Sequence, residues 1–587
     1  MRMKKCFSSR FISLTIVLLA ALVVSGCGTS LEKGRKPSAD WSRGVPLGTD
    51  VSGTLGFAVD QDGEGVHIVW SYVNDAGARN LRYFQLDQMA DVVVDREITL
   101  PAGRVRTPRI AAAGEGLHLF WVIRPEGTDK WQLWHALLDK QGVIVGQMTQ
   151  ISAEASNVRY YALASDTKGG AVLVWVDAKS NGLNFTHLSS DGEIIADSVL
   201  IVEQGESPAL RVDSQGAIHL AWMNGVDIKY ALLDSNKPGI VEGTSVAHIP
   251  QGTGARVNGP ALGLSDGWVY IFWSILNQSG LEAGTANTQF TAFPAGDPEE
   301  VAASRIGIMP FEEQPYQPYQ SWYEFDQFVP ASYAGMSSGF VYDPVTDPVQ
   351  QDELALALAF SQQYRLDSNV QIATGIFSDG QFKGYTLATK TLGISGGAAL
   401  SSDSNGNLHL VWQEGASGQH VYYASTAPAA RAALDHFAFD DIIKAILGGG
   451  LESIASVLLF PLAFPWMFPG LVLLVGWRLI RNDESLTNLS SRILLLVAIV
   501  MYQGTKLLIL PTMIEYVPFS AWMDIPAGWQ FPLRIGVPLI IFGIAIAGAE
   551  LIRRRRISST LLYYFSLVIT DTILTLAIYG VNFFGAY

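Results

Sequence analysis

Cysteine is almost absent from this sequence, which holds two in 587 residues. Two cysteines exclude a disulfide-stabilised scaffold and a metal site built on several thiolates. Charge is also scarce, because Asp, Glu, Lys and Arg make up 16% of the chain, and so small a share is typical of a protein with membrane segments. The net charge is -15. An acidic chain repels phosphate backbones, so nucleic acid is not an expected partner.

The N-terminus has the pattern of an export signal. Basic residues within the first ten positions precede an uncharged apolar stretch from residue 11 to 24, as in a signal peptide. The sequence Val-Ser-Gly-Cys at residues 24–27 follows directly and resembles the lipobox of bacterial lipoproteins. The resemblance implies a cleaved signal at residues 1–26 and a diacylglycerol on Cys27, followed by a linker to residue 42. An ordinary secretory signal is the alternative.

A phrase of turn, glycine, alternating apolar strand and tryptophan recurs along the middle of the chain. Its copies end at Trp70, Trp121, Trp175, Trp222, Trp273 and Trp412. The first five tryptophans are 51, 54, 47 and 51 residues apart. The gap of 139 residues before Trp412 leaves room for one more unit. The sequence ELALALAF, which ends at Phe360, fits as a degenerate seventh copy.

Each unit has the alternation and the turn residues of about four short strands. A period near 50 residues with four strands is typical of a propeller blade. The sequence therefore predicts an all-β, seven-bladed propeller over residues 43–427. The last copy has no fourth strand of its own, whereas residues 43–50 resemble a fourth strand without a blade. We expect this N-terminal strand to complete the last blade and so remove the exposed sheet edges.

The repeats resemble bacterial β-propellers of the sialidase-like and YVTN/WD-like kinds over residues 43–427. This resemblance implies the fold, and by analogy it gives a cell-surface glycoside hydrolase as the alternative function. The sialidase Asp box places tryptophan five residues after aspartate, whereas Trp222 and Trp412 follow Asp213 and Asp403 by nine residues. No catalytic constellation stands out. The main expectation is therefore a binding, interaction or scaffold protein that is not an enzyme and uses no cofactor.

Two sets of polar residues in the repeats are candidates for a site. Four histidines lie three residues before a blade tryptophan: His67, His118, His219 and His409. Because they belong to separate blades, we expect them to pack within the repeat and not to bind a metal. Four arginines lie in or near the first strands of blades: Arg109, Arg159, Arg211 and Arg256. The hydrolase alternative requires such arginines to converge with a carboxylate at the propeller axis.

An insertion at residues 306–350 is rich in aromatic and acidic residues. Long loops on a rigid scaffold often carry function, and aromatic rings beside carboxylates suit sugars, peptides or a protein partner. The candidate contact residues are Tyr316, Tyr319, Trp322, Tyr323, Glu324 and Asp326. The alternative is a flap that packs on the propeller or on the helices. The expected partners are membrane lipid and an envelope protein, a peptide or a polysaccharide.

The composition changes after residue 428. Residues 428–450 are predicted to form a linker or an interfacial helix, and residues 451–587 to form an all-α transmembrane bundle of about four spans. The expected spans are 453–477, 492–513, 533–552 and 561–583. Prolines interrupt the first of them.

Charge predicts the orientation of the spans. Arginines occur in the loops after the first and third spans, whereas the loop at residues 514–532 contains no Lys or Arg. The positive-inside rule therefore places the arginine loops in the cytoplasm and the propeller and C-terminus outside the cytoplasmic membrane.

Lys506 and Asp571 lie within two of the expected spans. Each would cost about 2.5–3.5 kcal/mol at the centre of a bilayer. Both spans run from inside to outside, and the two residues lie at a similar depth. We therefore expect an intramembrane pair, either as a structural clasp or as part of a proton or ion relay.

Overall fold

The computed structural model describes residues 40–580, with gaps. The gaps are residues 50, 74–76, 78, 115, 235–237, 250–253, 281–282, 300–304, 308–328, 331–340, 365–366, 390, 392–393, 416–419, 436–455, 482–484, 510–515, 520–526 and 555–558. The chain divides into a unit that holds the strands and a unit that holds the helices from residue 437 onward.

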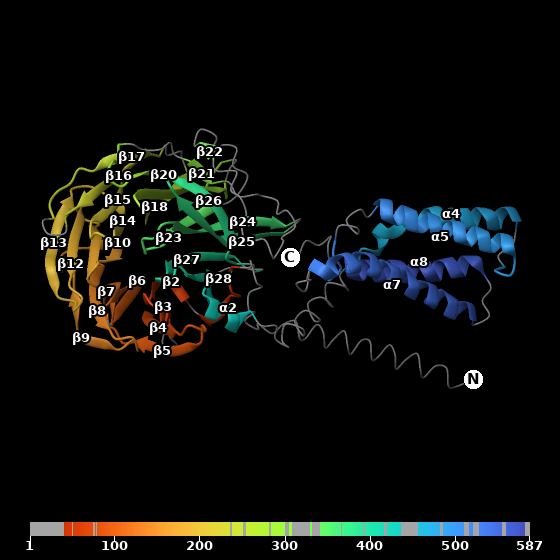
Figure 1. The fold of residues 1–587 in the computed structure, drawn as a ribbon, viewed down its shortest axis with the longest axis horizontal. Helices are drawn as coiled ribbons and strands as arrows, with labels where there is room; N and C mark the ends of the chain where they lie inside the picture. The colour runs from red at the N-terminus through yellow and green to blue at the C-terminus, as the bar shows by residue number, and fades with distance from the viewer. Residues whose placement is uncertain are drawn as a thin grey trace. The chain divides into compact units, whose positions relative to one another are not determined.

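Within the described residues the strands form seven antiparallel sheets arranged as the blades of a propeller (Figure 1). The first blade consists of β2 (Val51–Val59), β3 (Val66–Val73), β4 (Arg79–Leu86) and β5 (Val92–Ile98), and the second of β6 (Gly103–Ala113), β7 (Gly116–Pro125), β8 (Gln132–Leu138) and β9 (Ile144–Gln150). The third consists of β10 (Val158–Ser165), β11 (Ala171–Asp177), β12 (Leu183–Leu188) and β13 (Ile194–Val202). The fourth consists of β14 (Glu206–Val212), β15 (Ile218–Asn224), β16 (Asp227–Leu233) and β17 (Thr244–His248).

The last three blades complete the ring. The fifth blade consists of β18 (Ala255–Ser265), β19 (Trp268–Asn277), β20 (Ala286–Pro294), β21 (Arg305–Gly307) and β22 (Val329–Pro330). The sixth consists of β23 (Val341–Thr346), β24 (Leu354–Tyr364), β25 (Asp367–Ser378) and β26 (Gln381–Leu387). The seventh consists of β27 (Ser395–Ser402), β28 (Leu408–Glu414), β29 (His420–Ser425) and β1 (Val45–Thr49). The first-named strand of each blade is the innermost one, and neighbouring innermost strands contact each other around the axis.

The recurring tryptophan lies in the second strand of its blade and is buried. This holds for Trp70, Trp121, Trp175, Trp222, Trp273 and Trp412. Phe360 is also buried, in the second strand of the sixth blade. Because the apolar alternation places these rings between adjacent sheets, each blade contributes to a core that one blade alone could not bury. The predicted count of seven blades is confirmed.

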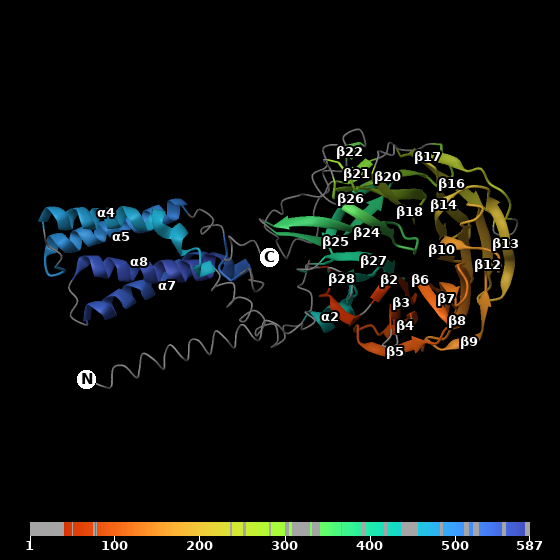
Figure 2. The same ribbon diagram turned by 180° about the vertical axis from the view of Figure 1, so that it is seen from behind.

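The N-terminal strand closes the ring, as predicted. β1 pairs antiparallel with β29, so that Val45 lies opposite Tyr423 and Thr49 lies opposite His420. The backbone N–H of Ser42 donates to the carbonyl of Ser425 at 2.9 Å. The helix α2 (Pro428–Leu434) follows β29 beside this blade (Figure 2). The chain therefore enters and leaves the propeller at the same end of one blade.

The described parts of the predicted insertion, residues 306–350, include strands of two blades. Its first residues form β21, which with β22 extends the fifth blade beyond four strands. Residues 341–346 form β23, the innermost strand of the sixth blade. This strand is difficult to predict from the sequence, because the sixth blade lacks the phrase of turn, glycine and tryptophan by which the other repeats are recognised.

Aspartates hold the turn between the first and second strands of several blades. The Oδ1 atom of Asp213 accepts hydrogen bonds from the backbone N–H groups of Gln215 and Ala217, at 2.9 and 2.7 Å. Its Oδ2 atom lies 3.3 Å from Nε2 of His219, whose Nδ1 atom lies 2.8 Å from the hydroxyl of Tyr230. We call the end of the propeller that carries these turns, at Asp60, Asp166, Asp213 and Asp403, the turn face.

The blade histidines take part in this packing, as predicted. His67 and His409 bond to tyrosine hydroxyls of the third strand as His219 does, and His118 bonds to His135. At Asp403, burial raises the pKa, but hydrogen bonds from His409 and Asn407 outweigh it and lower the pKa to about 2. The carboxylate is therefore a fixed anion that stabilises the turn.

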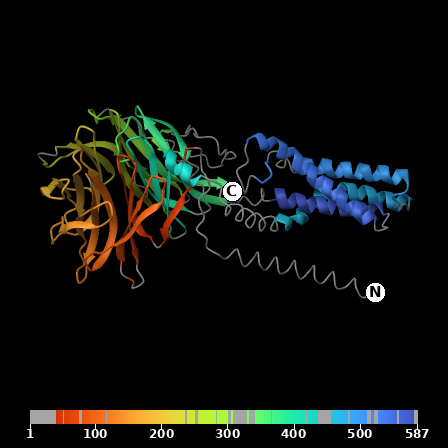
Figure 3. The same cartoon turned by 60° about the horizontal axis from the view of Figure 1, so that its bottom comes forward.

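The C-terminal unit is a bundle of helices that run side by side (Figure 3). It contains the short 3-10 helix η2 (Phe460–Ala463), α4 (Phe464–Arg481), α5 (Leu489–Ile509), α7 (Ala527–Arg554) and α8 (Thr560–Tyr579). Among the described residues, three helices are long and apolar enough to cross a membrane: Leu489–Ile509, Gly528–Arg554 and Thr560–Tyr579.

The sequence predicts about four spans, and three helices within the described residues meet that description. The first expected span, 453–477, is η2 followed by α4 within the described residues. Its prolines break the segment, because proline removes a backbone donor and clashes with the preceding turn. The helix that remains has 18 residues, with Pro469 inside it and Arg478 and Arg481 in its last turn.

We predict that Trp412→Ala opens the ring at its closure. The indole of Trp412 stacks on Tyr422 of β29 with ring centroids 5.5 Å apart, and a Cβ added at Gly44 would lie 2.7 Å from it. Its loss leaves a cavity beneath both chain segments at the closure, so the free energy of unfolding should fall by about 3–5 kcal/mol. Urea unfolding of the full-length protein in detergent measures this change.

The matched control is Val92→Ala on the outer strand β5, where the side chain is 46% exposed. This change should stay within about 0.5 kcal/mol. Equal effects of the two substitutions would contradict the role of Trp412.

Candidate functional site

The innermost strands share one irregularity near their N-terminal ends. In all seven blades the pairing register with the second strand shifts there, as in a β-bulge. The shifts fall between residues 51 and 55, 106 and 109, 158 and 161, 206 and 209, 258 and 261, 342 and 345, and 396 and 399. We call the end of the propeller that carries these shifts the bulged face. It lies opposite the turn face, because each innermost strand has its bulge at one end and its turn at the other.

Six of the seven bulges hold a residue with positive φ. In three of them the residue is glycine: Gly53, Gly259 and Gly397. In the other three it carries a side chain: Thr107 at 51°, Ser207 at 49° and Asp343 at 59°. Such conformations cost a non-glycine residue about 1–3 kcal/mol and concentrate at functional sites. The bulged face is therefore the first place to look for a site.

Asp343 is the carboxylate among these strained residues. It lies half-buried on β23, and its Oδ1 atom accepts a hydrogen bond of 2.7 Å from Nδ2 of Asn258 on β18. Burial raises the pKa of Asp343, and the hydrogen bond from Asn258 opposes the rise. The neighbouring Tyr342 has a raised pKa, through burial and then the charge of Asp343, with Arg256 acting the other way. Two blades thus place an acid, an amide, a phenol and a guanidinium together.

The same face carries further aromatic and charged groups. Arg159 and Glu206, from the third and fourth blades, form an ion pair at 2.9 Å. The Arg159 guanidinium also lies 5.4 Å above the ring of Tyr160, which is 44% exposed. The guanidinium of Arg106 lies 4.0 Å above the ring of Trp131. Proteins usually bind a sugar with exposed aromatic rings that are surrounded by hydrogen-bonding side chains.

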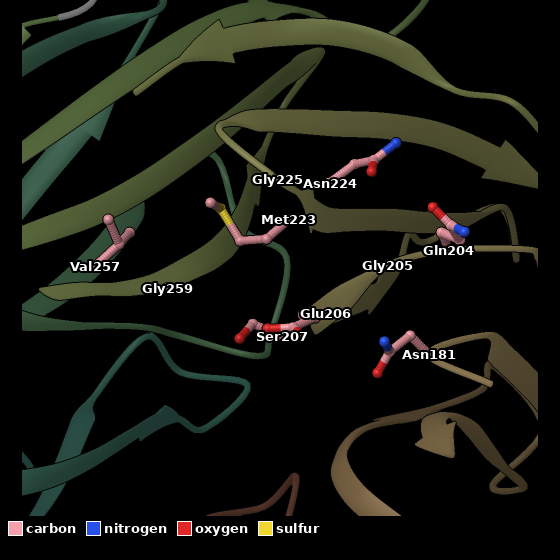
Figure 4. A pocket seen from close by; sticks show the side chains of 10 residues that line it. All are labelled: Asn181, Gln204, Gly205, Glu206, Ser207, Met223, Asn224, Gly225, Val257 and Gly259. Atoms are coloured by element: carbon pink, nitrogen blue, oxygen red, sulfur yellow. The ribbon is translucent and has the colours of Figure 1, made fainter. Parts of the chain in front are cut away.

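A pocket of about 440 Å³ opens on this face. Figure 4 shows Asn181, Gln204 and Asn224 on one side of it and Met223 and Val257 on the other. Glu206, Ser207 and Gly259 also line it, so it contains two of the bulge positions.

Two of the four candidate arginines converge near the axis. Arg211 donates from Nη2 to the hydroxyl of Thr346 at 2.8 Å, from the fourth blade to the sixth. Burial lowers the pKa of Arg211 to about 10; the charge of Asp347 raises it and that of Arg109 lowers it further. Asp347 is buried and accepts a hydrogen bond from the backbone of Ser402 at 3.1 Å. The charges of Arg109 and Asp347 thus both act on Arg211.

The aromatic candidates cannot be placed in this site. Tyr316, Tyr319, Trp322, Tyr323, Glu324 and Asp326 lie outside the described residues, as do the signal segment and Cys27. Lys506 and Asp571, in the helical unit, form an ion pair.

Sequence reasoning missed Asp343 and Asn258. The sequence does contain a pattern that marks the bulges. In the innermost strands of four blades, the residue with positive φ is followed by proline: Thr107, Ser207, Gly259 and Asp343. Proline restricts the conformation of the residue before it, so this recurring pair marked the bulges.

Comparison with known proteins finds no matching family model and no matching curated protein. Among solved structures, the chain is similar to the polysaccharide lyase Uly1, with 10% identity, a TM-score of 0.38 and coverage of 68% of this chain and 94% of that one. It is also similar to a GH43_1 enzyme from Xanthomonas citri, with 14% identity, a TM-score of 0.29 and coverage of 44% and 93%. A third is a putative exo-beta-1,3-galactanase from Bifidobacterium bifidum s17, with 13% identity, a TM-score of 0.29 and coverage of 47% and 100%.

These three solved structures are named as enzymes. The expectation that the chain is not an enzyme is therefore wrong. That expectation depended on finding no catalytic constellation in the sequence, and the bulges that gather polar side chains from separate blades are visible only in the fold. At such low identity and TM-score the likeness says nothing of the substrate, which has to be argued from this chain's own residues.

The raised pKa of Asp343 predicts how stability depends on pH. An aspartate in the unfolded chain ionises near pH 4, whereas Asp343 ionises at a higher pH in the fold. The group therefore contributes stability below about pH 4, and this contribution is lost as the pH rises through the folded pKa. Asp343→Asn keeps the acceptor for Asn258 and cannot ionise. Its Tm should match that of the wild type near pH 4 and exceed it increasingly toward about pH 7.

Asp379→Asn is the matched control for this measurement. Asp379 lies in the same blade, also has a positive φ, and has a side chain 81% exposed. Its substitution should leave the pH dependence of Tm unchanged. A difference between wild type and Asp343→Asn that stays constant with pH would contradict the prediction.

Proposed function

We propose that this protein is a membrane-anchored enzyme of the glycoside hydrolase class that cleaves a polysaccharide on the bulged face of its propeller. The observation that carries the proposal is Asp343, a half-buried carboxyl held at a positive φ of 59° and hydrogen-bonded by Asn258 of the neighbouring blade. Strained backbone and a pKa shifted by burial are the usual marks of a catalytic acid or base.

Asp343 has the chemistry that a general acid needs. A raised pKa keeps the carboxyl protonated closer to neutral pH, so that it can give its proton to the oxygen of a breaking glycosidic bond. Hydrolysis also needs a second carboxylate, as nucleophile or as base for water. Glu206 is the candidate, since it lines the pocket on the same face and is itself exposed.

The side chains on the bulged face favour a sugar polymer as the substrate. Tyr160 and Tyr342 offer rings, Asn258 offers an amide, and Arg159 and Arg256 offer guanidinium groups on the same face. A ring of seven bulges gives an extended surface on which several sugar units can lie. The arginines favour a polymer with carboxylate groups.

The proposed location is the outer face of the cytoplasmic membrane. Three helices supply the means of anchoring. With α4 as a fourth span, the positive-inside rule favours arginine-rich loops in the cytoplasm and a propeller outside. A diacylglycerol on Cys27 would be a second anchor, on the chain segment that precedes β1 in the sequence.

The test uses the full-length protein in membranes, with neutral and uronic-acid-containing polysaccharides as substrates and new reducing ends as the readout. Asp343→Asn should lower kcat by about 10²–10⁴-fold, the usual contribution of general acid–base catalysis. Asp379→Asn, in the same blade on the turn face, should leave kcat unchanged.

Full activity of Asp343→Asn would remove this residue from the mechanism. A wild-type protein that retains a polymer but releases no product would show that the propeller binds polysaccharide without cleaving it.

A further inference from the structure

A line of buried polar side chains follows one face of α8. It begins at Asp571 and continues four and eight residues later with Thr575 and Tyr579. Residues at this spacing lie above one another on a helix, and the three side chains are no more than 2% exposed. Ser456 is also buried and lies beside the end of the line, since a Cβ added at Gly580 would be 3.1 Å from its Oγ atom. We call these four residues the polar column.

One oxygen of Asp571 is fully engaged. The Oδ2 atom accepts hydrogen bonds from Nζ of Lys506 and, at 2.6 Å, from the hydroxyl of Tyr502, both on α5. The Tyr502 hydroxyl also lies 3.0 Å from Oγ1 of Thr572. These contacts alone would make a dry clasp between α5 and α8.

Within the described residues, the rest of the polar column has no hydrogen-bond partner. The Oδ1 atom of Asp571, the hydroxyls of Thr575 and Tyr579 and the hydroxyl of Ser456 make no hydrogen bond to any described residue. A buried polar group without a hydrogen bond costs roughly 1–3 kcal/mol, and such groups are normally satisfied by protein or by ordered water. Four of them in sequence therefore call for a common partner.

Water fits the spacing of these groups. Successive members of the column on α8 are four residues apart, a rise of about 6 Å. One water molecule that bonds to both neighbours spans about the same length, as two hydrogen bonds of about 2.8 Å. The column ends at Tyr579, the last residue of α8, and Ser456 lies beside that end.

The column extends in one direction only. On the other side of Asp571 the nearest buried residues of α8 are Val568 and Leu567, which are apolar. The next polar group there, the hydroxyl of Tyr564, donates to the carbonyl of Met467 at 3.0 Å and is satisfied. Water that reached Asp571 from the end of α8 would therefore stop at the ion pair.

We propose that the polar column is a file of water molecules that connects the C-terminal end of α8 with Asp571, so that the Lys506–Asp571 pair is a hydrated site open to one side of the membrane. Its ligands are water and the protons that water carries. Of the two roles considered for the pair, a structural clasp and a relay, the file of water favours the relay, because a clasp needs no path for water. The inference is independent of the proposed hydrolase activity.

The experiment measures how fast silver ions, which are of the size of a water molecule, reach single cysteines. Thiols must ionise to bind a metal, and they ionise in water. The parent is the full-length protein with Cys6→Ser and with Cys27 kept as a constant background. Membranes that carry each variant are treated with silver ions, and the thiols left free are alkylated after denaturation.

Thr575→Cys should be blocked at least ten times faster than two controls. Val568→Cys replaces a buried apolar side chain on the other side of Asp571, and Ile573→Cys replaces a side chain that is 38% exposed on the bundle surface. Ser456→Cys, a replacement of similar size, provides a second position in the column should Thr575→Cys not fold. It is also expected to be blocked rapidly.

Two outcomes would overturn the proposal. Slow block at positions 575 and 456, equal to that at 568, would mean that the pair is a dry clasp. Equally fast block at 568 would mean that water fills the bundle on both sides of the pair, in which case the site is not open to one side only.

Discussion

The pairing of β1 with β29 is the constraint on which the propeller depends. It joins residues 45–49 to residues 420–425, the first and last strands of the ring in sequence. Without it the seventh blade would have three strands and an open edge, and the first and seventh blades would not be held in contact. Each bulge on the inner strands takes its place in space from the ring, so the arrangement of polar groups on the bulged face also follows from this closure.

The two faces of the propeller use polar residues in opposite ways. On the turn face, aspartates such as Asp213 and Asp403 have their oxygens taken by backbone amides, histidine and asparagine. That network stabilises turns and leaves little for a ligand. On the bulged face, Asp343 has one hydrogen bond from Asn258 and sits in a strained backbone. The polar groups of the turn face therefore stabilise the fold, whereas those of the bulged face include side chains held in a strained backbone.

Features that recur in every blade could be predicted from the sequence. Features that depend on the pairing register of two strands could not. The tryptophans and Phe360 gave the blade number because they recur at a fixed period, and residues 43–50 gave the closure because a strand was missing elsewhere. Lys506 and Asp571 stood out because charge is rare in apolar helices. Asp343 did not stand out, since its conformation arises from a register shift against β24 and its partner Asn258 is 85 residues away. The bulges of the other inner strands have the same origin.

Both chain segments that lead out of the propeller leave from the turn face, where Val45 and Tyr423 lie opposite each other. A pull on either segment is borne by one blade at one end, and the ring is not stretched across its diameter. The backbone contacts of Ser42 with Ser425 and of Arg43 with Asp435 tie the two segments together at that point. A load on the chain at that point therefore acts on the ring closure, and the bulged face lies at the other end of the same blade.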